Sequence, residues 1–300
     1  MNLTQPQRLA IGISAAVGIF LTVQLLGLAL VPAFDAAGYQ AVEDPSNPVN
    51  ALAYIGGIIV VTGVMLLAFR FGAGWVMQAF VLLAVGGLSW YVLSVIVTPL
   101  AGVALAAVLV AALYLHPRWY VIDAAGIVVG AGAAGIFGIS FGLAPVFILL
   151  VLLAVYDFIS VYRTGHMLDL ADGVMRLRLP VVLVIPIRRS FSMMDFGDGD
   201  DSATAGERDA LFIGLGDAVI PAILVTSAAM FLPAAPVLGG VGLPVIGAMV
   251  GTIVGLLALL GLVLRGRAHA GLPLLNGGAI AGYLIAVAVA GIPLRVALGL

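Results

Sequence analysis

The chain contains, at residues 211–231, the run LFIGLGDAVIPAILVTSAAMF. A helix needs about 20 mostly apolar residues to cross the hydrocarbon core of a bilayer, and this run has that length. One residue breaks the apolar pattern, because Asp217 lies inside the run. An ionisable side chain deep in a span is costly and is a functional-site candidate by default. The stretch therefore predicts a membrane span that carries a functional carboxylate.

The rest of the chain has the composition of a membrane protein. Of its 300 residues, 63% are hydrophobic and 9% are charged, and so few charges cannot cover the surface of a soluble protein of this size. The absence of cysteine excludes disulfides and thiolate metal sites. A net charge of -2 gives no indication of a nucleic-acid partner. We expect the lipid bilayer to be the solvent for most of the chain.

Apolar runs of spanning length occur at nine places, which predicts an all-α membrane protein in one polytopic domain, residues 1–300. The first run exceeds the apolar core of a signal peptide and is expected to be a permanent span. The expected spans lie roughly at 9–31, 51–69, 76–97, 99–115, 120–140, 144–162, 211–231, 237–264 and 273–292.

A long connection, residues 163–210, separates the sixth span from the seventh and could act as a lid. Residues 165–179 mix apolar and charged side chains in a pattern that predicts a short amphipathic helix. The run PVVLVIP at 180–186 is too short to span and rich in β-branched residues, which predicts a strand. Residues 190–209 are acidic and rich in glycine, serine and methionine, which indicates a mobile segment.

Arginine gathers on one side of the predicted bundle. If the N-terminus is cytoplasmic, eleven arginines fall in cytoplasmic segments and only Arg295 falls outside. Positive residues favour the cytoplasmic side, so we expect a multi-pass cell-membrane protein with its N-terminus inside. The cytoplasmic set is Arg8, Arg70, Arg118, Arg163, Arg176, Arg178, Arg188, Arg189, Arg208, Arg265 and Arg267.

Glycines recur at four-residue spacing in two of the predicted spans. Such spacing lets helix backbones approach closely in lipid, so we interpret both sets as packing surfaces. They are Gly126, Gly130, Gly138 and Gly142 in or near the fifth span, and Gly247, Gly251 and Gly255 in the eighth.

Two ionisable residues lie clearly deep in the predicted spans, Asp157 and Asp217. Asp157 precedes Arg163 by six residues, and Asp217 follows Asp209 by eight. At about 1.5 Å per helical residue, their depths are roughly 9 and 12 Å from the same side of the membrane. A third acid, Asp123, stands near the start of the fifth span and is expected to be interfacial and structural. Neighbouring antiparallel spans should thus bring two carboxylates to nearly one level.

Two carboxylates that meet in a low-dielectric site cannot both ionise easily, so the pair holds a single proton. The ionised partner can take a proton from water while the protonated partner activates a peptide carbonyl. This is aspartic-protease chemistry, and it requires no metal, so no cofactor is expected. Gly214 and Gly216 would allow a substrate backbone close to Asp217. Tyr156 directly precedes Asp157 and can hydrogen-bond near the site.

The residues around both aspartates resemble the motifs of a known family. Tyr156-Asp157 in one span and Gly214-Leu215-Gly216-Asp217 in the next look like the YD and GxGD motifs of presenilins and signal peptide peptidases. Pro273-Leu274-Leu275 begins the last span, where that family has its PAL motif, with leucine in place of the alanine. The ordered set of motifs and the nine spans together cover most of the chain.

This resemblance implies an intramembrane aspartyl protease that hydrolyses peptide bonds within transmembrane segments of membrane proteins. Orientation and size resemble a prokaryotic, archaeal presenilin homologue, with no obligate partner subunit and with a homo-oligomer possible. Residues 181–185 and the backbone near 273–275 would flank an extended substrate. The catalytic residues would be Asp157 and Asp217, and the substrate-binding residues Tyr156, Gly214, Leu215, Gly216, Pro273, Leu274 and Leu275.

Three alternatives remain open at this point. A proton- or cation-coupled transporter would bind its ion with the same carboxylates at a broken helix, although the sequence has no visible inverted repeat. Prepilin peptidases also have a GxGD motif, but they have fewer spans and a basic residue soon after the aspartate, where this chain has Ala218-Val219-Ile220. A scaffold without activity is the third. Cleavage of a labelled transmembrane peptide distinguishes all of them.

The predicted topology can be tested at three loop positions. Nine spans with a cytoplasmic N-terminus put Asn47 outside, Ser192 inside and Leu300 outside. Because the chain has no cysteine, single cysteines at these positions can be labelled with a membrane-impermeant thiol reagent without background. Labelling of positions 47 and 192 from the same side would contradict the topology.

Overall fold

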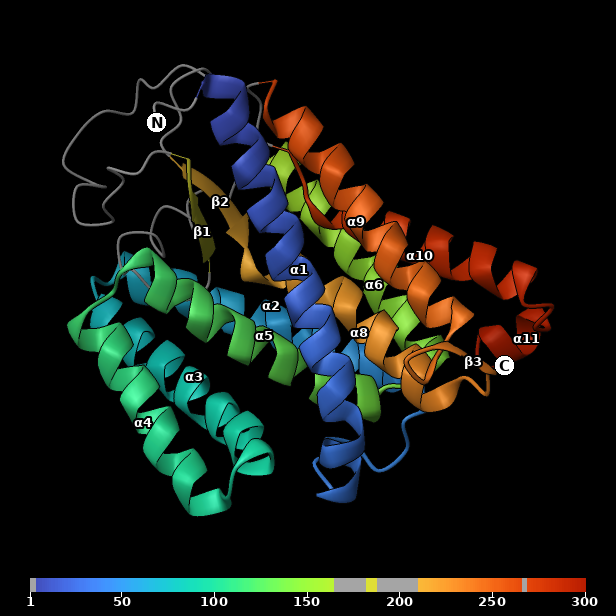
Figure 1. Cartoon of the computed structure of the whole chain (residues 1–300). Coiled ribbons are helices and arrows are strands. Elements are labelled where there is room, and N and C mark those ends of the chain that lie inside the picture. Colours follow the sequence, from blue (N-terminus) through green and yellow to red (C-terminus); the bar gives the residue numbers. More distant parts are fainter. Residues whose placement is uncertain (1–3, 165–181, 188–209, 266–268) are drawn as a thin grey trace.

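A computed structural model describes residues 4–164, 182–187, 210–265 and 269–300, which form a helical bundle with two small sheets (Figure 1). The helices are α1 (Gln5–Ala36), α2 (Val49–Arg70), α3 (Gly74–Ile96), α4 (Pro99–Leu115), α5 (Trp119–Ser140), α6 (Leu143–Ile159), α8 (Leu215–Phe231), α9 (Leu243–Val263), α10 (Leu272–Val289) and α11 (Leu294–Ala297). The π-helical turn η1 (Ser160–Thr164) continues α6, and the strands are β1 (Val182–Pro186), β2 (Ala210–Gly214), β3 (Pro236–Leu238) and β4 (Val241–Gly242).

Every predicted span coincides with a long helix of the described residues, so the predicted fold class is confirmed. Seven of these helices are long and apolar enough to cross a membrane unaided. The other two, α4 and α8, have 17 residues each, a length of about 25 Å. The chain is thus a multi-pass membrane protein.

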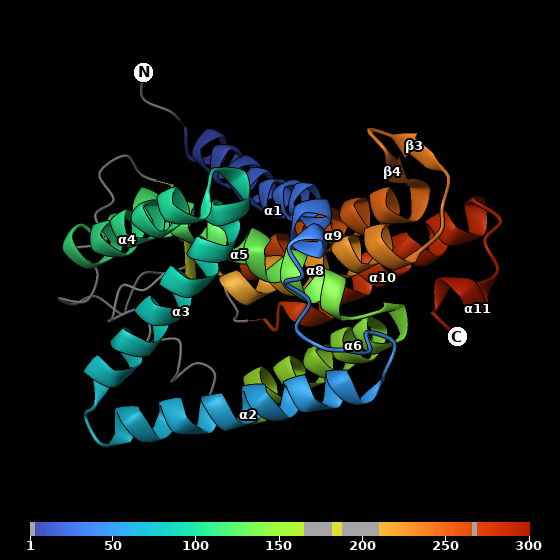
Figure 2. The same ribbon diagram turned by 90° about the horizontal axis from the view of Figure 1, so that it is seen from below.

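The helices form two groups on either side of α5. On one side α3 and α4 pack against each other and against α5, and on the other side α5 packs along α1 and α8. The second group continues through α6, α9 and α10, which all contact α8. Helix α2 lies at the periphery, where it runs along α6 (Figure 2). The long central helices therefore surround α8, the helix that carries Asp217.

Two predicted spans begin later than expected. The span predicted at 211–231 starts as β2, and helix α8 begins only at Leu215. Residues 211–213 pair with β1 because a bulky apolar run ending at glycine suits a strand as well as a helix. The span predicted at 237–264 starts as the β3–β4 hairpin, whose turn has left-handed φ angles of 58° at Gly239 and 82° at Gly240.

The strand predicted at 180–186 is confirmed for residues 182–186, which form β1 and pair antiparallel with β2. The register sets Val182 opposite Gly214 and Pro186 opposite Ala210. The amphipathic helix predicted at 165–179 and the mobile segment predicted at 190–209 lie outside the described residues.

The end of α5 that lies far from this sheet is fastened by hydrogen bonds between connections. The Ala41 amide donates to Ser140 Oγ at 2.8 Å, and the Gly142 amide donates to the Pro45 carbonyl at 2.8 Å. Ser227 Oγ of α8 donates to the Phe141 carbonyl at 2.8 Å. The connection before α2 is therefore held against the α5–α6 turn.

Helices α9 and α10 form the most extensive helix pair of the bundle. A Cβ atom on Gly251 would collide with the carbonyl oxygen of Gly278, and one on Gly247 would collide with that of Gly282. Gly255 approaches the Leu274 carbonyl in the same way. The packing role predicted for the α9 glycines is confirmed, since only glycine permits this backbone contact.

Replacing Gly251 with alanine should separate α9 from α10. Overpacking of this kind costs about 1–3 kcal/mol, so the melting temperature of the purified protein should fall. Gly261 is the matched control, because it lies on the same helix and a Cβ atom there meets no atom within 4 Å. An equal melting temperature for Gly251→Ala and Gly261→Ala would contradict the packing role.

Candidate active site

Asp157 lies near the C-terminal end of α6, and it is 3% exposed. Its Oδ2 accepts a hydrogen bond of 3.0 Å from the Leu272 amide, the first residue of α10. The Gly271 amide also interacts with this carboxylate. The first amides of a helix have no partner within the helix. Asp157 therefore caps α10 from a neighbouring helix.

Asp217 lies in the first turn of α8, immediately after β2. A Cβ atom on Gly271 would lie 2.7 Å from Asp217 Oδ2 and 2.8 Å from Oδ1. The absence of a side chain at Gly271 thus lets the start of α10 touch this carboxylate. On its other side, a Cβ atom on Gly214 would lie 3.5 Å from Oδ2, and one on Gly216 would meet no atom within 4 Å. A side chain at Gly216 would therefore begin in space that the described residues leave open.

The structure brings the two aspartates together at one place, the segment Gly271-Leu272. Asp157 binds the amides of this segment, and Asp217 lies against the Cα atom of Gly271. The two carboxylates are also close enough to interact electrostatically. Helices α6, α8 and α10 therefore position a carboxylate pair between them, as an acid–base site for hydrolysis requires.

The remaining predicted site residues differ in how deeply they are buried. Gly214 and Gly216 are exposed beside Asp217, and Leu215 and Tyr156 are partly buried. Pro273 and Leu274 are partly buried at the start of α10. Leu275 is fully buried and packs in the core with Leu256 and Leu259. Its side chain therefore supports α10 instead of lining an open surface.

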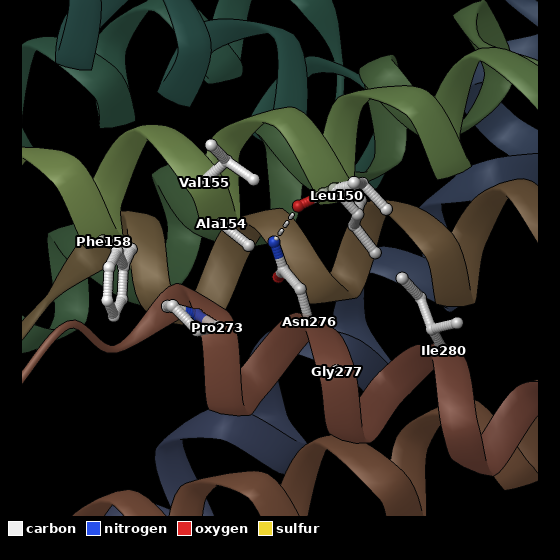
Figure 3. Close-up of a pocket in the computed structure, with 9 residues that line it drawn as sticks. Leu150, Ala154, Val155, Phe158, Pro273, Asn276, Gly277 and Ile280 are labelled. Atoms are coloured by element: carbon white, nitrogen blue, oxygen red, sulfur yellow. Dashed lines mark hydrogen bonds between the residues drawn. The ribbon is translucent and has the colours of Figure 1, made fainter.

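An apolar pocket of about 330 Å³ lies between α6 and α10, next to Pro273 (Figure 3). Asn276 lines it, and its Nδ2 donates to the Leu150 carbonyl of α6 at 2.8 Å. This bond ties α10 to α6 one turn beyond the segment that touches the aspartates. The residues that line the pocket are Leu150, Val151, Ala154, Val155, Phe158, Pro273, Asn276, Gly277 and Ile280.

Sequence reasoning missed residues that act through the backbone or from the interior. Gly271 and Leu272 hold the carboxylates with main-chain atoms, which leave no side-chain signal. Asn276 is 1% exposed, and the signal that could have found it is a polar residue inside an apolar span. Asp123 was expected to be interfacial and structural. A structural role agrees with its burial at 8% exposure and with the 2.7 Å hydrogen bond that its Oδ1 accepts from the Val184 amide of β1, a partner that the sequence did not indicate, while its depth in the membrane stays a prediction.

The chain matches known proteins over most of its length. The family described as signal-peptide peptidase, presenilin aspartyl protease matches residues 17–292. Two solved structures described as a presenilin family intramembrane aspartate protease, in C222 and P2 space groups, are each 36% identical to the chain. The match to the first structure covers 93% of this chain and 99% of the solved chain, with a TM-score of 0.69. The match to the second structure covers 91% of this chain and 96% of the solved chain, with a TM-score of 0.65. No curated protein sequence matches the chain.

The match of motifs, bundle and carboxylate pair leads to one conclusion. The family match covers more than half of the chain, and the solved structures share its fold at 36% identity. The chain belongs to the presenilin and signal peptide peptidase family and is an intramembrane aspartyl protease.

Proposed function

We propose that Asp157 and Asp217 are the catalytic pair with which this protease cleaves its transmembrane substrates. The observation that carries the proposal is the meeting of both carboxylates at Gly271-Leu272, between three helices of the bundle. The transporter and scaffold alternatives have no observation in their favour.

In this mechanism the pair shares one proton. The ionised carboxylate takes a proton from water, and the water oxygen attacks the carbonyl carbon of the scissile peptide. The protonated carboxylate gives its proton to the carbonyl oxygen, which forms a tetrahedral diol. When the diol collapses, the carboxyl that took the proton from water gives it to the leaving nitrogen and the C–N bond breaks. The other carboxylate takes the proton of a diol hydroxyl, which re-forms the carbonyl and restores the singly protonated pair.

The substrate has to lie extended beside the pair, because a helix hides its peptide groups in internal hydrogen bonds. A Cβ atom on Gly216, the residue before Asp217, would meet no described atom within 4 Å, and this supports a substrate path past Gly214, Leu215 and Gly216. Tyr156 and the segment Pro273-Leu274-Leu275 would complete this path. For Leu275 the contribution is its backbone, because its side chain is buried in the core.

We also propose the arrangement of the whole protein in the cell. The arginine distribution supports a cytoplasmic N-terminus in the cell membrane. Residues 1–300 would act as one polytopic domain without an obligate partner subunit, alone or as a homo-oligomer.

Substitution of either aspartate tests the catalytic pair. Asp157→Asn or Asp217→Asn should remove essentially all cleavage of a single-span substrate in detergent, and the double variant should lose little more, because the carboxylates act as a unit. Product formation and the melting temperature are measured together. A folded single variant that cleaves near the wild-type rate would refute the assignment.

Side chains of increasing size at Gly216 test the substrate path. A Cβ atom there meets no described atom within 4 Å, so Gly216→Ala should fold, and the melting temperature of Gly216→Leu checks that it folds as well. If the substrate backbone passes this point, kcat/KM should fall stepwise, by roughly 100-fold for leucine, as expected for a misplaced reacting group. Gly261→Leu is the control, since it fills equally open space on α9. Unchanged kcat/KM for Gly216→Leu would show that the substrate lies elsewhere.

A further inference from the structure

Asp123 is a buried acid that the catalytic proposal does not use. It stands in the first half of α5, and its Oδ1 accepts the hydrogen bond from the Val184 amide at 2.7 Å. Val184 is the central residue of β1. A carboxylate that accepts from a backbone amide forms a charge-assisted bond, which is stronger than a neutral one. The strand is thus fastened to α5 at its midpoint.

The bond occupies the edge of β1 that faces away from β2. In an antiparallel pair, hydrogen-bonded and non-hydrogen-bonded residue pairs alternate. Since the Val184 amide donates to Asp123, the pair Val184–Phe212 is non-hydrogen-bonded, and the ladder bonds fall to its neighbours Leu183–Ile213 and Ile185–Leu211. Asp123 therefore takes the place that a third strand would need beside β1.

Both faces of the two-stranded sheet are covered as well. Leu183, Ile185, Leu211 and Ile213 pack in a cluster with residues of α1, α8 and α9. Val184 and Ala210 pack in a second cluster with Ile122 and other residues of α3 and α5. These apolar contacts do not fix the position of β1 along its own axis, because such packing is non-directional. The directional hydrogen bond to Asp123 fixes the position of β1 along this axis.

The position of β1 determines the position of Asp217. Register pairs Val182 with Gly214, and Gly214 is the N-cap of α8. Asp217 follows in the first turn of that helix. A shift of β1 along its axis would carry β2 and the start of α8 with it, and hence the carboxylate of Asp217.

We propose that Asp123 is a positioning residue of the proteolytic reaction. By holding the Val184 amide it fixes the β1–β2 sheet against α5, and through the sheet it fixes the position of Asp217 and of the bound substrate. This inference rests on the proposed roles of Asp157 and Asp217.

Substitutions that keep or remove the acceptor test the proposal. Asp123→Asn keeps an Oδ1 acceptor, and Asp123→Ala removes it. Ser140→Ala is the matched control, because Ser140 lies at the opposite end of α5 and also accepts from a backbone amide, that of Ala41, at 2.8 Å. For each purified protein, kcat, KM, the cleavage position by mass spectrometry and the melting temperature are measured with one single-span substrate. Hydrogen exchange of the peptide that contains residues 182–186 reports on β1 independently of activity.

Asp123→Ala should lower kcat by roughly 10- to 100-fold, as expected for a displaced catalytic group, and should spread or shift the cleavage position. Exchange in residues 182–186 should become faster. Asp123→Asn should keep most of the activity and the wild-type cleavage position, and Ser140→Ala should change neither.

Three results would overturn the proposal: wild-type kcat and cleavage position in Asp123→Ala, equal losses in the Asn and Ala variants, or a loss that Ser140→Ala reproduces at the same change in melting temperature. An inactive wild type would refute the proposed function instead, and unchanged exchange in Asp123→Ala would still refute the hold on β1.

Discussion

The cost of keeping carboxylates inside an apolar helical bundle shapes the centre of this protein. Each acid within a span needs a polar partner, because lipid offers none. Asp157 finds its partners in the unpaired amides at the start of α10, and Asp123 finds its partner in the Val184 amide of β1. In both cases a side chain from one helix satisfies the main chain of another element. These bonds specify how α5, α6, β1 and α10 lie relative to one another, which apolar packing alone does not.

Asp217 differs from the other two acids in what surrounds it. Its carboxylate lies against Gly271, where a Cβ atom would come within 2.7 Å of Oδ2. The pair is therefore unequal, since Asp157 accepts a main-chain hydrogen bond and Asp217 lies against Gly271 at the start of α10. Such a difference in environment is how two chemically identical groups take separate roles as acid and base.

Much of the fold could be predicted from the sequence, because apolar runs of spanning length report directly on a lipid environment. All nine long helices of the described residues and the strand at β1 follow from length, composition and β-branching. The start of α8 could not be predicted, since Leu211-Phe212-Ile213 suits a helix and a strand equally and only the pairing with β1 decides. Asp157 and Asp217 stood out as acids in apolar runs. Gly271 and Leu272 did not, because they act through main-chain atoms. The partner of Asp123 could not be predicted either, because nearness to a helix end in sequence does not reveal contact with another element.

The glycine contact between α9 and α10 has a consequence for motion. Interlocked backbones cannot slide past each other without separating, so we expect the two helices to move as one rigid unit. One end of this unit is the segment Gly271-Leu272, which contacts both aspartates. If this segment moves when a peptide reaches the carboxylates, α9 and α10 have to move together. The contacts that α9 makes with α1 and α8 then have to change as well. Access to the aspartates would then be mechanically linked to the packing of the first helix of the chain.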